Sequence, residues 1–177
     1  MFLRNLTIPC LALAGMILAS AGNAAAQGPE NCTTISSEVL PVSICLDPDG
    51  WALANLDGAE EHGFRRKDHD MFVLMITETD AFDLDTLKKA ILTNAQTAAG
   101  LHKIKTLEDD RVSIGDKEFG RIVYKAHVND LDVTYANYYT SFDNKGSLQI
   151  VAFAAAEEFD SIRPIIDEVI ESIDIAE

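Results

Sequence analysis

Three runs of strand-forming residues in the second half of the chain are separated only by short turns. The runs cover residues 117–128, 133–142 and 147–155 and are rich in Val, Ile, Tyr, Phe and Thr. Gly115 and Asp116 precede the first run, NDLD follows it, and DNKG joins the other two, all of them sequences that turns favour. Because parallel strands need a long crossover connection, these short turns predict an antiparallel meander.

Two segments with a helical repeat of apolar residues flank this meander. In residues 80–100, Asp83 is placed to cap the N-terminus of a helix and Gly100 to end it. In residues 157–175 the same repeat predicts a second helix, with Pro164 in the first turn of its main part, where a missing N–H costs little. Each helix has one apolar face that must be buried. We therefore predict an α+β fold in which a mostly antiparallel sheet is sandwiched with two amphipathic helices.

Shorter strands are predicted ahead of the meander. Asp47, Pro48, Asp49 and Gly50 form a turn sequence with a strand expected on each side. Residues 71–76 are apolar on both faces, which is typical of a strand in the middle of a sheet. The predicted strands cover residues 33–46, 51–56, 63–68, 71–79 and 111–114.

The first 26 residues have the pattern of a secretory signal peptide. Arg4 is followed by an apolar run through about Ser20 and by three alanines that end at Ala26. The run is too short and too rich in alanine for a transmembrane anchor, so we expect cleavage before Gln27 and a periplasmic or secreted protein. The predicted parts are a signal peptide of residues 1–26, an N-terminal segment of residues 27–46 and an α+β domain of residues 47–177.

Cleavage would leave two cysteines, Cys32 and Cys45. In an exported chain such a pair is predicted to form a disulfide. Chain-entropy theory assigns about 3 kcal/mol to closing a 15-residue loop, which is close to the span between them. A redox or metal role would need C-x-x-C spacing or further Cys and His residues nearby, and the sequence has neither.

The chain is strongly acidic, with 14 Lys and Arg against 29 Asp and Glu and a net charge of −15. Such a surface repels nucleic acid at long range, so no nucleic-acid partner is expected. Against this background Arg65, Arg66 and Lys67 form a basic triplet. Two interpretations stay open: charged side chains that keep a strand from pairing with another chain, and a docking patch for an acidic partner.

A second candidate contact surface is the tyrosine-rich strand of residues 133–142. Tyr135 and Tyr139 are predicted to share one face of that strand, because side chains alternate along it. Burial against a helix and contact with a partner or ligand both stay open for these two side chains.

No residue is predicted to be catalytic. The sequence contains no nucleophile elbow, phosphate loop or dinucleotide fingerprint, so we predict no cofactor and favour a non-enzymatic protein. His62 and His69 stand at opposite ends of a predicted strand, about 20 Å apart at 3.3 Å per residue. Because zinc ligands lie within about 2.3 Å of one ion, no metal site is predicted there.

The order of these elements resembles the PsbP-like fold of small exported bacterial proteins, the group that includes DcrB-like periplasmic proteins. The resemblance covers residues 43–175 and is carried by the PDGW sequence of residues 48–51, by Gly115 with Gly120, and by Glu158 and Phe159 followed by Pro164. It implies a fold without common catalytic residues. Members act as accessory subunits of a photosynthetic complex, as a binding partner of a small GTPase, and as chaperones for secreted effectors. The cysteine pair is an addition to the pattern.

These expectations combine in one functional hypothesis. The chain is expected to be an exported, non-catalytic binding or accessory protein that acts through protein–protein interaction in the cell envelope, with an envelope or secreted protein as its partner. Two alternatives stay open: a small-molecule or lipid carrier that uses a groove between helix and sheet, and, third, a hydrolase or metalloenzyme.

Overall fold

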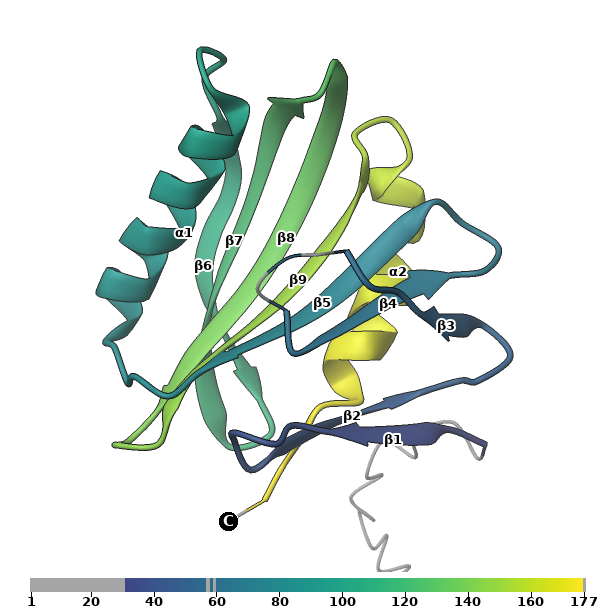
Figure 1. Cartoon of the computed structure of the whole chain (residues 1–177), viewed down its shortest axis with the longest axis vertical. Coiled ribbons are helices and arrows are strands. Elements are labelled where there is room, and N and C mark those ends of the chain that lie inside the picture. The colour runs from purple at the N-terminus through teal and green to yellow at the C-terminus, as the bar shows by residue number, and fades with distance from the viewer. Residues whose placement is uncertain (1–30, 57, 59, 177) are drawn as a thin grey trace, which may run out of the picture.

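A seven-stranded antiparallel sheet forms the centre of the molecule (Figure 1). The computed structural model describes residues 31–56, 58 and 60–176, so the expected signal peptide lies outside the described residues. The strand order is β3-β4-β5-β9-β8-β7-β6. The strands are β3 Trp51–Leu53, β4 His62–Arg66, β5 Met71–Glu78, β6 Lys105–Ile114, β7 Lys117–Val128, β8 Leu131–Phe142 and β9 Gly146–Ala155.

The predicted meander is present as the consecutive strands β6 to β9, which pair antiparallel with their neighbours. Asn129 and Asp130 both have positive φ angles, of 50° and 62°, as a two-residue hairpin turn of type I′ requires. Strand β6 is longer than predicted, because it begins at Lys105 instead of Arg111. The added residues are mostly charged or polar and mostly exposed, so they carry no apolar alternation that would mark them as a strand.

The two helices, α1 Leu84–Ala99 and α2 Phe159–Glu171, cover opposite faces of the sheet (Figure 1). Side chains of α1 pack with Ile122 and Tyr124 of β7, whereas side chains of α2 share a core with Val123 between them. Since neighbouring residues of a strand point to opposite faces, the two helices lie on opposite sides. We name these sides the α1 face and the α2 face. The predicted α+β sandwich is confirmed.

The ends of α1 agree with the sequence prediction, whereas the start of α2 does not. Asp83 caps α1 by accepting a hydrogen bond from the Thr86 backbone N–H at 2.8 Å, and Gly100 ends the helix at a φ of 59°. Helix α2 begins at Phe159, so Pro164 lies inside it and not in its first turn. Phe159 and Ile162 are buried in the core, and this packing stabilises a turn of helix ahead of the proline.

A second sheet of three short strands packs against α2. It has the order β1-β2-β10, formed by β1 Thr33–Ser36, β2 Val42–Leu46 and β10 Asp174–Ile175. Strands β2 and β3 flank the predicted turn but belong to different sheets, and β3 ends earlier than predicted, at Leu53. Cys32 and Cys45 lie together as a disulfide with Cα atoms 5.5 Å apart, which joins the start of β1 to β2.

The two faces of the large sheet are covered to different extents. Strand β5 lies in the interior of the sheet, as predicted, and its side chains Met71, Val73 and Met75 are fully buried on the α2 face. Phe72 and Leu74, which point to the α1 face, are only half-buried. Helix α1 packs on β7 and β8, so the part of this face formed by β5 and β9 stays partly open. None of the described helices has the length and apolar character needed to cross a membrane.

Candidate functional site

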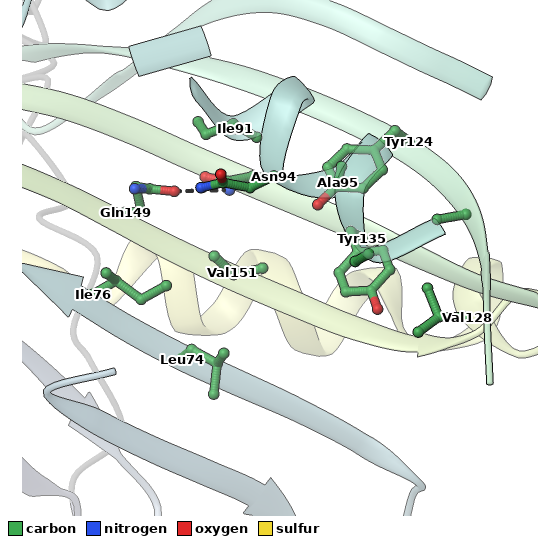
Figure 2. Close-up of a pocket in the computed structure, with 13 residues that line it drawn as sticks. Leu74, Ile76, Ile91, Asn94, Ala95, Tyr124, Val128, Tyr135, Gln149 and Val151 are labelled. Carbon is green, nitrogen blue, oxygen red and sulfur yellow. Dashed lines mark hydrogen bonds between the residues drawn. The ribbon is translucent and has the colours of Figure 1, made fainter. Parts of the chain in front are cut away.

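An apolar groove lies on the α1 face, between α1 and strand β5 (Figure 2). Its volume is about 230 Å³. Ile91 and Ala95 of α1 form one wall, and side chains of β5, β7, β8 and β9 form the floor. None of the 13 lining residues is charged. This neutral lining sets the groove apart from the rest of a strongly acidic chain.

Two larger hollows have a different chemical character. A hollow of about 710 Å³ is lined by charged residues that include Asp83, Lys117 and Glu118, and one of about 520 Å³ is lined by Lys125 and Asp132 among others. Since binding sites for organic ligands and apolar side chains are mostly apolar with a few placed polar groups, the groove is the better candidate.

Four aromatic rings form a row across the α1 face. Phe72 of β5 stacks on Phe153 of β9 with ring centres 5.3 Å apart, Phe153 stacks on Tyr135 of β8 at 5.4 Å, and Tyr135 stacks on Tyr124 of β7 at 5.1 Å. The four residues are direct cross-strand neighbours. Arg65 of β4 extends the row, with its guanidinium carbon 6.0 Å from the centre of the Phe72 ring. The row provides a continuous aromatic surface that runs into the groove.

The two tyrosines predicted as contact residues share a face, as expected, but they differ in burial. Tyr139 is only 3% exposed and packs with the residues of α1. Its ring lies over Gly120, where an added Cβ would clash with it. Tyr135 is half-buried and lines the groove. Tyr139 is therefore a core residue, and only Tyr135 remains available to a partner.

Three side-chain amides interrupt the apolar lining: Asn94 of α1, Asn137 of β8 and Gln149 of β9. The Asn137 Nδ2 group donates a hydrogen bond to Gln149 Oε1 at 3.2 Å, drawn as a dashed line in Figure 2. Asn137 is 3% exposed, and its Oδ1 atom has no hydrogen-bond partner in the part of the chain that the structure describes. A buried carbonyl oxygen without a partner costs about 1–3 kcal/mol. Among the described residues that line the groove, Asn137 thus has a buried acceptor whose bonding capacity is unused.

The hydroxyl groups of the groove stay protonated. Burial raises the pKa of Tyr124, and the neighbouring Tyr135 raises it further. Burial also raises the pKa of Tyr135. Both phenols are therefore neutral at physiological pH and keep the O–H as a donor.

The basic triplet does not form one patch, because Arg65 and Arg66 lie on opposite faces of β4. The Arg65 side chain is 59% exposed on the α1 face and lies 3.7 Å from Asp70. The Arg66 side chain is 18% exposed, lies 5.5 Å from the centre of the Trp51 ring, and donates from Nε to Asp68 Oδ1 at 2.6 Å. Only Arg65 therefore adjoins the aromatic row.

Lys67 and Lys105 have other surroundings. Lys67 donates from Nζ to the backbone oxygen of Pro48 at 2.8 Å and so helps to close the chain around the turn before β3. Lys105 begins β6, which is the opposite edge of the large sheet from β3 and β4. Lys105 therefore does not extend the basic triplet.

The two histidines of residues 62–70 lie in different surroundings. His62 Nε2 lies 3.2 Å from the backbone oxygen of Ser36, a contact that links β4 to β1, and His69 is exposed in the turn after β4. Within residues 31–56, 58 and 60–176, no group of three or more His, Cys, Asp or Glu side chains is placed to hold a metal ion.

The sequence matches no protein-family model and no curated protein. The structure is similar to cyanobacterial PsbP (CyanoP) from Synechocystis sp. PCC 6803, with a TM-score of 0.62 and 12% identity over 90% of this chain and 99% of that one. This chain has the PsbP-like fold. LpqN of Mycobacterium tuberculosis follows with a TM-score of 0.57 and 15% identity over 83% of this chain and 91% of LpqN. The Saccharomyces cerevisiae Ran-binding protein Mog1p has a TM-score of 0.54 and 12% identity over 82% and 95% of the two chains.

The PsbP-like fold agrees with the resemblance seen in the sequence, but the groove of this PsbP-like chain was not expected at these residues. Leu74, Phe153 and Asn137 are not among the contact residues that the sequence predicts. For Leu74 the sequence shows only that residues 71–76 are apolar on both faces, a pattern that predicts burial and not a groove. Asn137 has no such signal, because an asparagine in a strand is ordinarily placed in contact with water.

Proposed function

We propose that the chain is an exported, non-catalytic binding or accessory protein that acts through protein–protein interaction in the cell envelope. The groove and its aromatic row carry this proposal, because they form a neutral, partly exposed apolar surface on a protein with a net charge of −15. Contiguous exposed apolar surface on a soluble protein marks a contact site. Export is supported by the signal-peptide pattern of residues 1–26 and by the disulfide of Cys32 and Cys45.

The size of the groove favours a protein partner over a carried ligand. Pockets that enclose small molecules have volumes of about 300–1,000 Å³, whereas the groove has about 230 Å³ and opens along β5. The half-buried Phe72 and Phe153 continue the apolar surface beyond the groove. A small recess beside a flatter aromatic surface suits one or two anchoring side chains of a protein partner.

The structural neighbours support a binding role by analogy only. Mog1p is described as a Ran-binding protein, and LpqN as involved in cell envelope biogenesis. Because one fold serves many functions, the argument rests on the groove and not on these neighbours.

The second candidate function is a small-molecule or lipid carrier, which the uncharged lining of the groove favours. Organic extraction of the natively purified protein followed by mass spectrometry separates the two candidates. A stoichiometric lipid or small molecule without a protein partner would support the carrier and contradict the main proposal.

Site-specific photo-crosslinking in producing cells tests the protein–protein interaction. A photoreactive residue at Leu74, in the groove, is expected to capture one defined envelope or secreted protein. The matched control is the same residue at Leu53, which is 79% exposed at the edge strand β3 and lies outside the groove. Equal capture from both positions, or capture from Leu53 alone, would contradict the groove as the contact surface.

A further inference from the structure

We propose that the groove accepts an aromatic side chain with an N–H or O–H donor from the partner protein, and that Asn137 Oδ1 accepts its hydrogen bond. This inference rests on the proposed function and names the chemical group that the contact surface recognises. Three observations carry it: the charge of the lining, the aromatic floor and the unused acceptor.

The lining excludes an ionised occupant. None of the described residues that line the groove is charged, and the phenols of Tyr124 and Tyr135 stay neutral. A carboxylate or ammonium group placed there would lose its hydration without gaining a counter-charge. The lining therefore favours an occupant that is uncharged where it enters the groove.

The floor favours a flat aromatic group. Tyr124 and Tyr135 stack with their planes 12° apart, and Phe153 continues the row at 28° from Tyr135. Aromatic rings prefer neighbours at centre-to-centre distances of 4.5–7 Å in stacked or edge-to-face geometry. A further ring placed against this row continues the existing packing, whereas a flexible acyl chain would lose more conformational freedom there.

The unused acceptor adds a requirement for a donor. The hydrogen bond from Asn137 Nδ2 to Gln149 Oε1 holds the Asn137 amide in one orientation. Its Oδ1, an atom of a residue that lines the groove, is left unpaired by the residues that the structure describes. The partial negative charge of this oxygen is complementary to an N–H or O–H proton. A site with an unpaired polar group discriminates against an analogue that cannot bond to it.

Indole and 1-methylindole form a matched pair of probes for this inference, because they differ in the N–H group. Each is titrated into the isotope-labelled full chain, and amide NMR shifts are followed. We expect shifts at the backbone of Leu74, Ala95 and Val151, and a dissociation constant about 3- to 10-fold lower for indole, the range that one net hydrogen bond produces. Equal affinity, or tighter binding of 1-methylindole, would overturn the inference.

The variant Asn137→Leu removes the acceptor and keeps a side chain of similar size. It is expected to bind indole and 1-methylindole with equal affinity, while the control Leu53→Ala keeps the preference of the original chain. Retained preference in a folded Asn137→Leu protein would overturn the role of Asn137. If this variant does not fold, the comparison of the two probes on the original chain decides the inference.

Other occupants give distinct results. Dodecanol that displaces indole and binds more tightly would assign the groove to an acyl chain, and groove shifts that depend on protein concentration without any probe would assign it to a second copy. Either result overturns the inference. The probes are measured without a partner protein, so this test is independent of the crosslinking experiment. A clear preference for indole together with failed crosslinking at Leu74 would contradict the proposed function, but it would leave the inferred recognition of an aromatic donor intact.

Discussion

Both faces of strand β5 carry apolar side chains, but only the side chains on one face are completely buried. Met71, Val73 and Met75 are completely buried beneath α2 and the three-stranded sheet, whereas Phe72, Leu74 and Ile76 are half-buried beside α1. The apolar residues of the second set therefore contribute less to folding than their composition suggests. The α2 side of β5 is therefore the more completely buried, whereas its α1 side keeps apolar surface available for contact.

Side-chain hydrogen bonds add to the apolar packing on the α2 face. Glu61 accepts hydrogen bonds from the Ser37 and Thr77 hydroxyls at 2.8 and 2.6 Å, and these bonds join the small sheet to β5. Arg163 of α2 donates from Nη2 to Glu108 of β6 at 2.6 Å. The α2 face thus has both an apolar core and polar links at its rim.

The largest expected difference between the faces comes from neighbouring residues of β5. Met75→Ala should cost about 2–5 kcal/mol of unfolding free energy, because it leaves a cavity in a completely buried site. Leu74→Ala should cost about 1 kcal/mol, because its side chain already meets solvent. Urea unfolding of both variants measures the difference. Equal losses would mean that the two faces are packed equally well.

The disulfide should contribute the next largest effect, since it holds the sheet that packs on α2. Replacing both Cys32 and Cys45 by Ser should lower the unfolding free energy by about 3 kcal/mol. Thermal melts in non-reducing buffer measure this loss, and a reducing agent should destabilise the original chain but not the variant. Unchanged stability in the variant would show that the bond adds nothing to the α2 face.

Arg65 and Arg66 of β4 lie on opposite faces of the sheet, so their substitution compares the two faces at polar side chains. Arg66→Ala should cost about 1 kcal/mol, because its side chain packs over Trp51 and bonds to Asp68. Arg65→Ala should change the unfolding free energy by less than about 0.5 kcal/mol, because the side chain is exposed. A larger loss for Arg65→Ala, measured by urea unfolding, would contradict the assignment of the faces.

The smallest expected effect depends on pH. The hydrogen bond from Arg163 holds the pKa of Glu108 below its usual value, which is about 4.3 in an unfolded chain. A lowered pKa in the folded state stabilises the protein above pH 4.3, and this contribution is lost as the pH falls through the folded-state pKa. Glu108→Gln should therefore be less stable at pH 7 by under about 1 kcal/mol.

A series of melts at different pH values is the control for the Glu108→Gln prediction. Thermal melts of the original chain and of Glu108→Gln should differ at pH 7 and converge as the pH falls below about 4. A difference that persists unchanged at low pH would mean that the glutamate acts through packing and not through its charge.

The meander, the ends of α1 and the cysteine pair could be predicted because each depends on short-range chemistry. Asn129 and Asp130 take up a two-residue turn, Asp83 bonds to an N–H three residues on, and the cysteines follow from the export pattern. The predicted start of α2 was wrong, because the burial of Phe159, a long-range effect, outweighed the local preference of Pro164 for the first turn of a helix.

The groove could not be predicted from the sequence in the same way. An amphipathic helix must bury its apolar stripe, but the stripe alone does not say which strands it covers or how many it leaves open. The position of α1 over β7 and β8 buries Tyr139 and leaves Tyr135 accessible. It also encloses Asn137, whose Oδ1 has no partner among the described residues. Local residue chemistry was enough for the elements and their turns, whereas packing between distant segments created the contact surface.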